Sequence, residues 1–214
     1  MDTLSEEEQD EILRKYDPES NTRDLGSIFR KIVFIGLLAF SLFQLYTAIF
    51  GQYTAYVQRS IHLGFALSLI FILFPAKKRL KKEKRGKVPF YDLILAVLSV
   101  GVGLYWPLNI EKITMQVGRL TDMDLIVGII AILLTLEAAR RAVGIPITII
   151  SSLFLVYAFL GPYFPGFLNH RGQDVKSIVR TMFYTTDGIL GTPISVSATF
   201  IFVFLLFGAF LVKT

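Results

Sequence analysis

The chain of 214 residues is 53% hydrophobic and only 18% charged, whereas a soluble domain usually has about 25% charged residues. This composition favours a protein embedded in a bilayer over a soluble all-α core, and the net charge of +5 is interpreted as a determinant of membrane topology rather than of nucleic-acid binding. The sequence has no Cys, which excludes disulfides, thiolate nucleophiles and cysteine metal sites.

The N-terminal residues are polar and acidic, and we expect a cytoplasmic tail over 1–31. The opening MDTLSEEEQDEI has neither the basic region nor the early apolar region of a signal peptide. The SEEE stretch that starts at Ser5 has capping-box spacing and Asp17-Pro18 is a stop signal, so the sequence predicts a short helix at 5–16. A solvated tail with no further role is the simplest interpretation of this helix.

Apolar runs of membrane-spanning length follow the tail. A helix needs about 20 apolar residues to cross ~30 Å of hydrocarbon, and four runs within residues 32–142 come close to that length. These predicted spans are about 32–50, 60–75, 90–108 and 122–141. Two further spans, at about 145–163 and 192–212, fall in residues 143–214. The sequence thus predicts an all-α, polytopic integral membrane protein with about six transmembrane helices.

The loop between the second and third spans is strongly basic. Eight basic residues stand there against Glu83 alone: Lys77, Lys78, Arg79, Lys81, Lys82, Lys84, Arg85 and Lys87. Short loops rich in Lys and Arg stay on the cytoplasmic side, so we expect a multi-pass protein of the cell inner membrane with a cytoplasmic N-terminus. A nucleic-acid-binding patch is the alternative, but the loop has no interleaved aromatic residues.

Aromatic residues agree with this orientation, because Tyr and Trp gather at membrane interfaces. Those at the predicted outer ends of the spans are Tyr46, Tyr53, Tyr56, Tyr105, Trp106, Tyr157 and Tyr163. The outer segment 165–191 agrees less well, since it carries three basic residues against two acidic ones. Its 174–184 stretch is expected to form an interfacial helix.

The stretch TLEAARRAVGIPI places charge directly after an apolar run. Glu137 stands three and four residues before Arg140 and Arg141, so all three side chains can meet on one helix face. Gly144 suits the end of that helix, and Pro146 suits the first turn of the next one. The simplest interpretation is a tight turn at the inner end of the fourth span, where Arg side chains reach the headgroups. The alternative is a packing or gating joint in which Glu137 lies deep enough to need its arginine partners.

No catalytic, cofactor or metal site is predicted. Asp92 and Asp124 lie at the starts of spans, where the helix macrodipole favours a carboxylate, so capping explains both. A role for either in binding a coupling ion is the alternative. His62 and His170 are too isolated for a metal site. The GVG at 101–103 lies inside a span and favours close helix packing over dinucleotide binding.

Three strings resemble one transporter family. LEAARRAVGIPI, YAFLGPYFPGFLNHRG and YTTDGILGTPISVSATFIFVFLLFGAFL are similar to the fused permeases of tripartite ATP-independent periplasmic (TRAP) transporters of the TAXI type. The resemblance covers about 122–214 with specific strings, and over 1–121 it rests mainly on the number of helices and the basic loop. Asp187 stands where such permeases more often have Glu.

The resemblance implies a sodium-driven secondary transporter, not an enzyme, that takes up organic acids delivered by a periplasmic solute receptor. A small four-helix scaffold domain precedes a large transport domain in such permeases, so 32–142 would be the scaffold and 143–214 the start of the transport domain. The structural seam between them would be formed by Glu137, Arg140, Arg141, Gly144 and Pro146. The hairpins that hold substrate and sodium come later in the family, so substrate-binding residues are expected beyond residue 214. The remainder of the transport domain is then an expected partner, beside the receptor and the lipid bilayer.

Two alternatives stay open. An unrelated structural or signalling membrane protein would share the apolar spans without any functional link to a receptor. A membrane-embedded enzyme would need clustered His, Asp or Glu at depth, whereas this sequence has two scattered His and carboxylates only at the ends of its spans.

Overall fold

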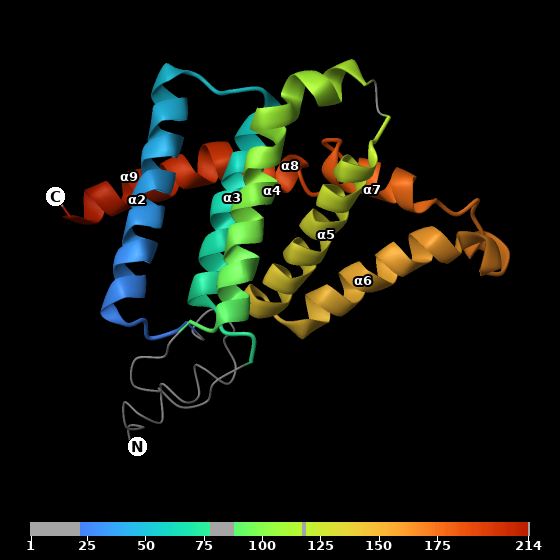
Figure 1. The fold of residues 1–214 in the computed structure, drawn as a ribbon, viewed down its shortest axis with the longest axis horizontal. Helices are drawn as coiled ribbons and strands as arrows, with labels where there is room; N and C mark the ends of the chain where they lie inside the picture. The colour runs from blue at the N-terminus through green and yellow to red at the C-terminus, as the bar shows by residue number, and fades with distance from the viewer. Residues whose placement is uncertain (1–21, 78–87, 117–118, 214) are drawn as a thin grey trace.

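The computed structural model describes residues 22–77, 88–116 and 119–213, which form an all-α fold (Figure 1). The predicted helix at 5–16 and nearly all of the basic loop lie outside the described residues. An up-and-down bundle is formed by α2 (Ser27–Phe50), α3 (Ala55–Leu73), α4 (Phe90–Met115) and α5 (Asp122–Ala142). The end of this bundle that holds residues 22–26, the start of α4 and the end of α5 is called the N-terminal end below, and the other the opposite end.

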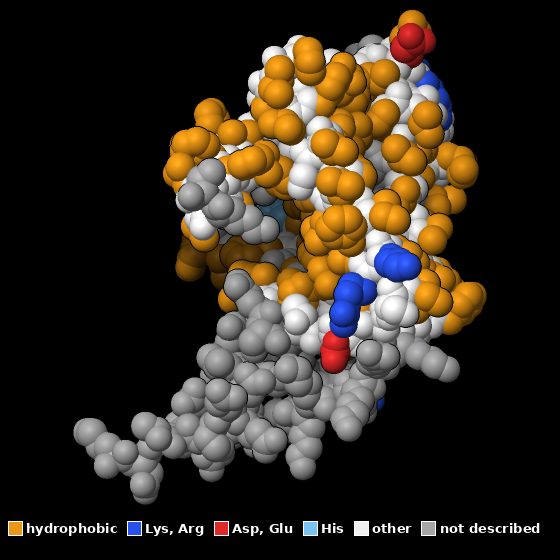
Figure 2. Space-filling view, turned by 90° about the vertical axis from the view of Figure 1, so that its left-hand side faces the viewer, with side chains coloured by type: hydrophobic (Ala, Val, Ile, Leu, Met, Phe, Trp, Pro, Cys, Tyr) orange, Lys and Arg blue, Asp and Glu red, His pale blue; other side chains and the backbone are white. Residues whose placement is uncertain are grey.

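The lengths and hydropathy of the helices make this a polytopic membrane protein. Among the described residues, five helical segments are long and apolar enough to cross a bilayer: Ser27–Phe50, Ala55–Leu73, Phe90–Met115, Ile145–Tyr163 and Thr192–Val212. The sequence predicts about six spans, and the remaining one is α5, which has 21 residues but carries charged side chains near both ends. Hydrophobic side chains cover most of the described surface in Figure 2, as expected where helices face lipid.

Two glycines allow α3 and α4 to approach each other closely. A Cβ atom on Gly64 would lie 2.8 Å from Cα of Gly103, and one on Gly103 would lie 2.7 Å from Cα of Gly64. Small residues at such crossings are common in membrane proteins because they let the backbones touch. The predicted packing role of the GVG glycines is therefore confirmed for Gly103, whereas a Cβ on Gly101 would meet nothing within 4 Å.

Helix α4 is kinked and longer than predicted. The predicted span ends at residue 108, but the helix continues to Met115. Pro107 lies inside it, where the ring has no N–H to donate and crowds the carbonyl one turn back. Asn109 has non-helical φ and ψ of −122° and 15°, and its Nδ2 donates to the Tyr105 carbonyl at 3.0 Å. The predicted end of the span therefore marks a kink rather than a helix end.

Helix α6 (Ile145–Leu160) leaves the N-terminal end of the bundle and has no buried residue. It leads through short 3-10 turns to α7 (Val175–Phe183), which is the helix expected at 174–184. The apolar face of α7 is buried against α5, where Val179 packs on the bare Cα of Gly128. This face therefore packs against protein and not against lipid.

The predicted span 192–212 is divided into three segments: α8 (Thr192–Val196), a π-helical turn (Ser197–Ile201) and α9 (Phe202–Lys213). Helix α9 runs across α2 rather than alongside it (Figure 1), and the rings of Phe40 and Phe202 meet at this crossing with centroids 5.0 Å apart. Because helices that cross steeply cannot both follow the membrane normal, α2 and α9 are differently inclined to the bilayer.

Candidate functional site

The predicted seam residues meet at the N-terminal end of the bundle. Glu137 accepts hydrogen bonds from Arg140 Nε and Nη2, each at 2.8 Å, and from Arg141 Nε at 2.7 Å. These are the pairs that the three- and four-residue spacing predicts. Gly144 follows with a φ of 124° and a ψ of 176°, a region that is essentially restricted to glycine. Pro146 stands in the first turn of α6, so the turn between the helices is as tight as predicted.

Asp92 extends these contacts to α4, and capping does not account for its surroundings. Its side chain is fully buried in the first turn of α4. Arg141 Nη1 donates to Asp92 Oδ1 at 2.6 Å, and Arg23 Nη2 donates to Oδ2. The interpretation of Asp92 as an ordinary helix cap is therefore corrected, because two buried arginines face it. We call the row Arg23, Asp92, Arg141, Glu137 and Arg140 the charge network; it joins three cations to two carboxylates.

The charge network also binds the carbonyl groups that follow α3. Arg140 Nη1 donates to the carbonyl of Ala76 at 3.0 Å, and Arg141 Nη1 donates to that of Phe74 at 3.4 Å. Carbonyls at the end of a helix have no partner within the helix, so guanidinium groups satisfy them well. The network therefore connects the segment before α2, through Arg23, with α3, α4 and α5.

A second buried carboxylate, Asp124, holds the opposite end of the bundle. The N–H of Thr121 donates to Asp124 Oδ2 at 2.8 Å, and Thr121 Oγ1 accepts from the N–H of Asp124 at 3.4 Å. The predicted capping role is therefore confirmed. The hydroxyl of Tyr105 also donates to Asp124 Oδ1, and Lys112 Nζ lies 3.3 Å from the same oxygen. The capping carboxylate thus also ties α4 to α5.

Tyr184, which follows α7, attaches the 165–191 segment to this cluster. Its hydroxyl donates to the Asp124 carbonyl at 2.7 Å. Burial raises the pKa of Tyr184, so the hydroxyl stays protonated and remains a donor. Beside it, Trp106 stacks on Tyr56 with ring centroids 4.4 Å apart and donates its Nε1–H to the Phe183 carbonyl at 3.3 Å.

His62 belongs to a buried, uncharged cluster between α2, α3 and the π-helical turn. Gln58 Nε2 donates to Gln44 Oε1 at 3.0 Å and to Thr47 Oγ1 at 3.1 Å. Gln44 Nε2 then donates to His62 Nδ1, which leaves Nε2 as the protonated nitrogen of a neutral ring. That nitrogen lies 3.2 Å from Ser197 Oγ. We call these five residues the amide cluster.

The sequence contains a signal for the amide cluster that was missed. Gln58 and His62 are four residues apart, and Gln44 and Thr47 are three apart, so each pair lies on one face of an apolar helix. Polar side chains on one face inside a span usually bond to a neighbouring helix. His170 is separate: its Nε2 lies 3.1 Å from the carbonyl of Tyr157, near the end of α6.

The described residues contain no candidate metal site, since no three His, Asp or Glu side chains lie close enough to share an ion.

Comparisons of the chain with protein-family models, with curated proteins and with solved structures found no match. The fold and the buried clusters define a multi-pass, all-α membrane protein. Both buried carboxylates and the amide cluster act as joints between its helices.

Proposed function

We propose that this chain is the scaffold portion of the permease of a TRAP-type secondary transporter. One observation supports this proposal most. Buried ionic groups join α3, α4 and α5 and the segment before α2 at the N-terminal end, and they join α4 to α5 at the opposite end, whereas α6 departs across the Gly144 turn with no buried residue of its own. A scaffold joined to a separate transport domain requires such a division. The strings of the resemblance begin at this same turn, and they are the basis for proposing the TRAP family.

In this proposal the protein lies in the inner membrane with its N-terminus in the cytoplasm. The segment 165–191 faces the periplasmic receptor, and the remainder of the transport domain packs against α6. That remainder supplies the hairpins for substrate and sodium. The transporter takes up organic acids with the sodium gradient, and the scaffold holds the transport domain at a fixed depth.

Uptake in proteoliposomes tests the proposal. The chain is reconstituted with the polypeptide encoded directly downstream and with the receptor encoded beside it, and a panel of labelled mono- and dicarboxylates is offered. Uptake is expected only with all three components and an inward sodium gradient, and it should stop when potassium replaces sodium.

Two results would refute the proposal. Receptor-dependent, sodium-driven uptake by the chain alone would show that it already contains the transport core. Neighbouring reading frames that encode neither further apolar spans nor a secreted receptor would remove the transporter assignment and favour an unrelated membrane protein.

A further inference from the structure

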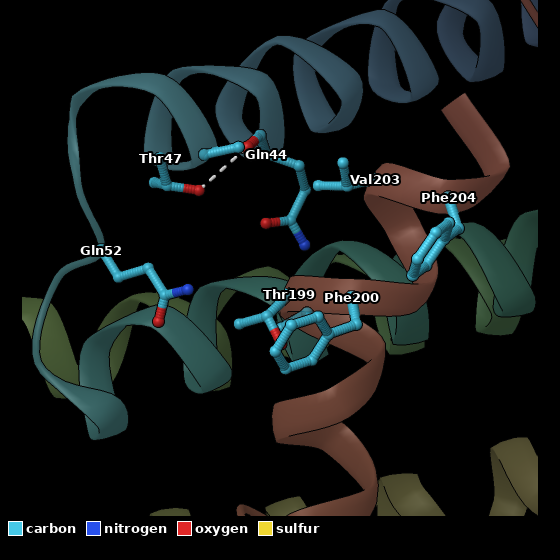
Figure 3. Close-up of a pocket in the computed structure, with 9 residues that line it drawn as sticks. Gln44, Thr47, Gln52, Thr199, Phe200, Val203 and Phe204 are labelled. Atoms are coloured by element: carbon cyan, nitrogen blue, oxygen red, sulfur yellow. Dashed lines mark hydrogen bonds between the residues drawn. The ribbon is translucent and has the colours of Figure 1, made fainter. Parts of the chain in front are cut away.

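A cleft of about 290 Å³ opens where α9 crosses α2 (Figure 3). The residues after the middle of α2 form one wall, with the amide of Gln44 and the hydroxyl of Thr47 at its floor. The other wall is the π-helical turn and the start of α9, where Phe200 and Phe204 border the opening. The volume is near the lower limit of ligand pockets, about 300 Å³, so part of a small amphiphile fits it.

The two walls differ in chemistry, and neither carries charge. The side chains that line the cleft include no Asp, Glu, Lys, Arg or His. Hydrogen-bond donors come from amides: Gln44 Nε2 uses one N–H for His62 and keeps a second. Gln52 adds a further amide, and its side chain bonds to none of the described residues. The facing wall is apolar and open, with Phe200 66% and Phe204 72% exposed.

The surroundings of the cleft indicate what fills it. Helices α2 and α9 are among the most apolar segments of the chain, and their outer faces are unburied in the described structure. The cleft also reaches the end of α2 at Phe50, where the chain leaves the apolar run for the polar loop that holds Gln52. A bilayer places the ester groups of its lipids at this boundary between hydrocarbon and water.

We propose that this cleft binds one membrane lipid. The uncharged ester region lies against the exposed amide of Gln52, whose N–H groups donate to an ester carbonyl, and an acyl chain follows Phe200 and Phe204 into the bilayer. Because no charged side chain lines the cleft, the site does not select the headgroup by charge. The bound lipid fills the wedge left by the crossing helices and so stabilises α9 against α2.

A pair of neighbouring substitutions tests the site. Ala48 is exposed and lines the cleft, so Ala48→Trp fills it without replacing a buried residue. Ile49 is 65% exposed and does not line the cleft, so Ile49→Trp is the matched control. Each protein is purified in a mild detergent, and the lipid molecules that stay bound to each chain are counted by native mass spectrometry after addition of phosphatidylglycerol or phosphatidylethanolamine.

The wild type and Ile49→Trp should retain one lipid more than Ala48→Trp, with phosphatidylglycerol and phosphatidylethanolamine retained about equally. Equal retention by both tryptophan variants would overturn the proposal, and so would retention of the anionic lipid alone. A change in the mass of the oligomer without a change in lipid count would show that a second copy of the chain covers the cleft instead.

A second variant tests the amide contact without filling the cleft. Gln52→Leu lies in the loop after α2, outside any helix, so the fold does not depend on it. Loss of a neutral hydrogen bond should lower lipid affinity by about 2- to 10-fold. Unchanged affinity in Gln52→Leu would refute the proposed contact with the ester groups.

Discussion

Asp92 is a fully buried carboxylate at the N-terminal end of the bundle. A buried carboxylate loses its hydration, and only close partners offset that cost. Arg23 and Arg141 are buried as well, so removal of the carboxylate would leave Arg23 without this ion pair and Arg141 with Glu137 alone. Glu137 and Arg140 are partly exposed, where an ion pair contributes far less.

We therefore predict an order of stability within the charge network. Asp92→Asn should lower the free energy of unfolding by about 3–5 kcal/mol, because it removes the ion pair of the buried Arg23 and one of the two ion pairs of the buried Arg141. Arg140→Lys should cost less than about 1 kcal/mol, and Glu137→Ala should fall between the two. Unfolding by SDS titration in mixed micelles measures all three. If Asp92→Asn proved as stable as Arg140→Lys, the stabilising role assigned to Asp92 would be wrong.

Gly144 is the residue whose backbone the seam requires. Its φ of 124° and ψ of 176° lie where a Cβ atom is strained, so Gly144→Ala should cost about 1–3 kcal/mol. Gly26 is the control, because its φ of −61° suits any residue and a Cβ there would meet nothing within 4 Å. The same SDS titration applies, and equal stability of Gly144→Ala and Gly26→Ala would contradict the strained turn.

At the scale of helices, the contact between α3 and α4 depends on two backbones that touch. Gly103→Ala would push a Cβ against the Cα of Gly64, and overpacking of this kind costs about 1–3 kcal/mol. Gly101→Ala, two residues away on an open face, should be neutral or stabilise by up to about 1 kcal/mol. Thermal melting in detergent compares the two variants. A Gly101→Ala protein that melts as low as Gly103→Ala would show that the close contact between α3 and α4 is not the cause of the loss.

The sequence predicts contacts within one helix better than contacts between helices. The pairs of Glu137 with Arg140 and Arg141 follow from spacing alone, as does the Thr121–Asp124 cap. The ion pairs of Asp92 with Arg23 and Arg141 join positions 69 and 49 residues apart, and no periodicity links them. Sequence reasoning therefore located Asp92 at the right helix end but assigned it too small a role.

Hydropathy likewise predicts that a helix is apolar but not how it is shaped. The runs of α2, α3 and α6 were visible as spans because length and composition are enough to detect them. The continuation of α4 past Pro107 is not predictable from the sequence, because a kink and a helix end share the same sequence signal. Nor does an uncharged run reveal the π-helical turn at Ser197–Ile201, since one extra residue per turn leaves composition unchanged.

The parts of the molecule differ in how much of their surface is buried. The charge network joins α3, α4 and α5 to the segment before α2 at the N-terminal end, and Asp124 joins α4 to α5 at the opposite end, so these helices should move as one body. Helix α6 buries no residue, and α9 contacts the bundle mainly where it crosses α2. The inclination of α9 was not predictable from its sequence, because it is set by packing rather than by the length of the apolar run.

The membrane orientation of the chain can be tested directly because the sequence has no Cys. Val143 in the turn before α6 is 61% exposed, and Phe167 beyond α6 is 95% exposed. The 19 residues of Ile145–Tyr163 between them cover about 28 Å at 1.5 Å per residue, nearly the thickness of the hydrocarbon core. The two positions should therefore face opposite sides of the membrane.

Val143→Cys and Phe167→Cys are labelled in spheroplasts with a membrane-impermeant maleimide, then again after solubilisation in detergent to show that both thiols react. With the N-terminus in the cytoplasm, Phe167→Cys should react in intact spheroplasts and Val143→Cys only after lysis. The reverse pattern would place the N-terminus outside and remove the receptor-facing role proposed for 165–191. Labelling of both in intact spheroplasts would show that α6 does not cross the bilayer, and the seam would then join the bundle to a helix lying along the membrane surface.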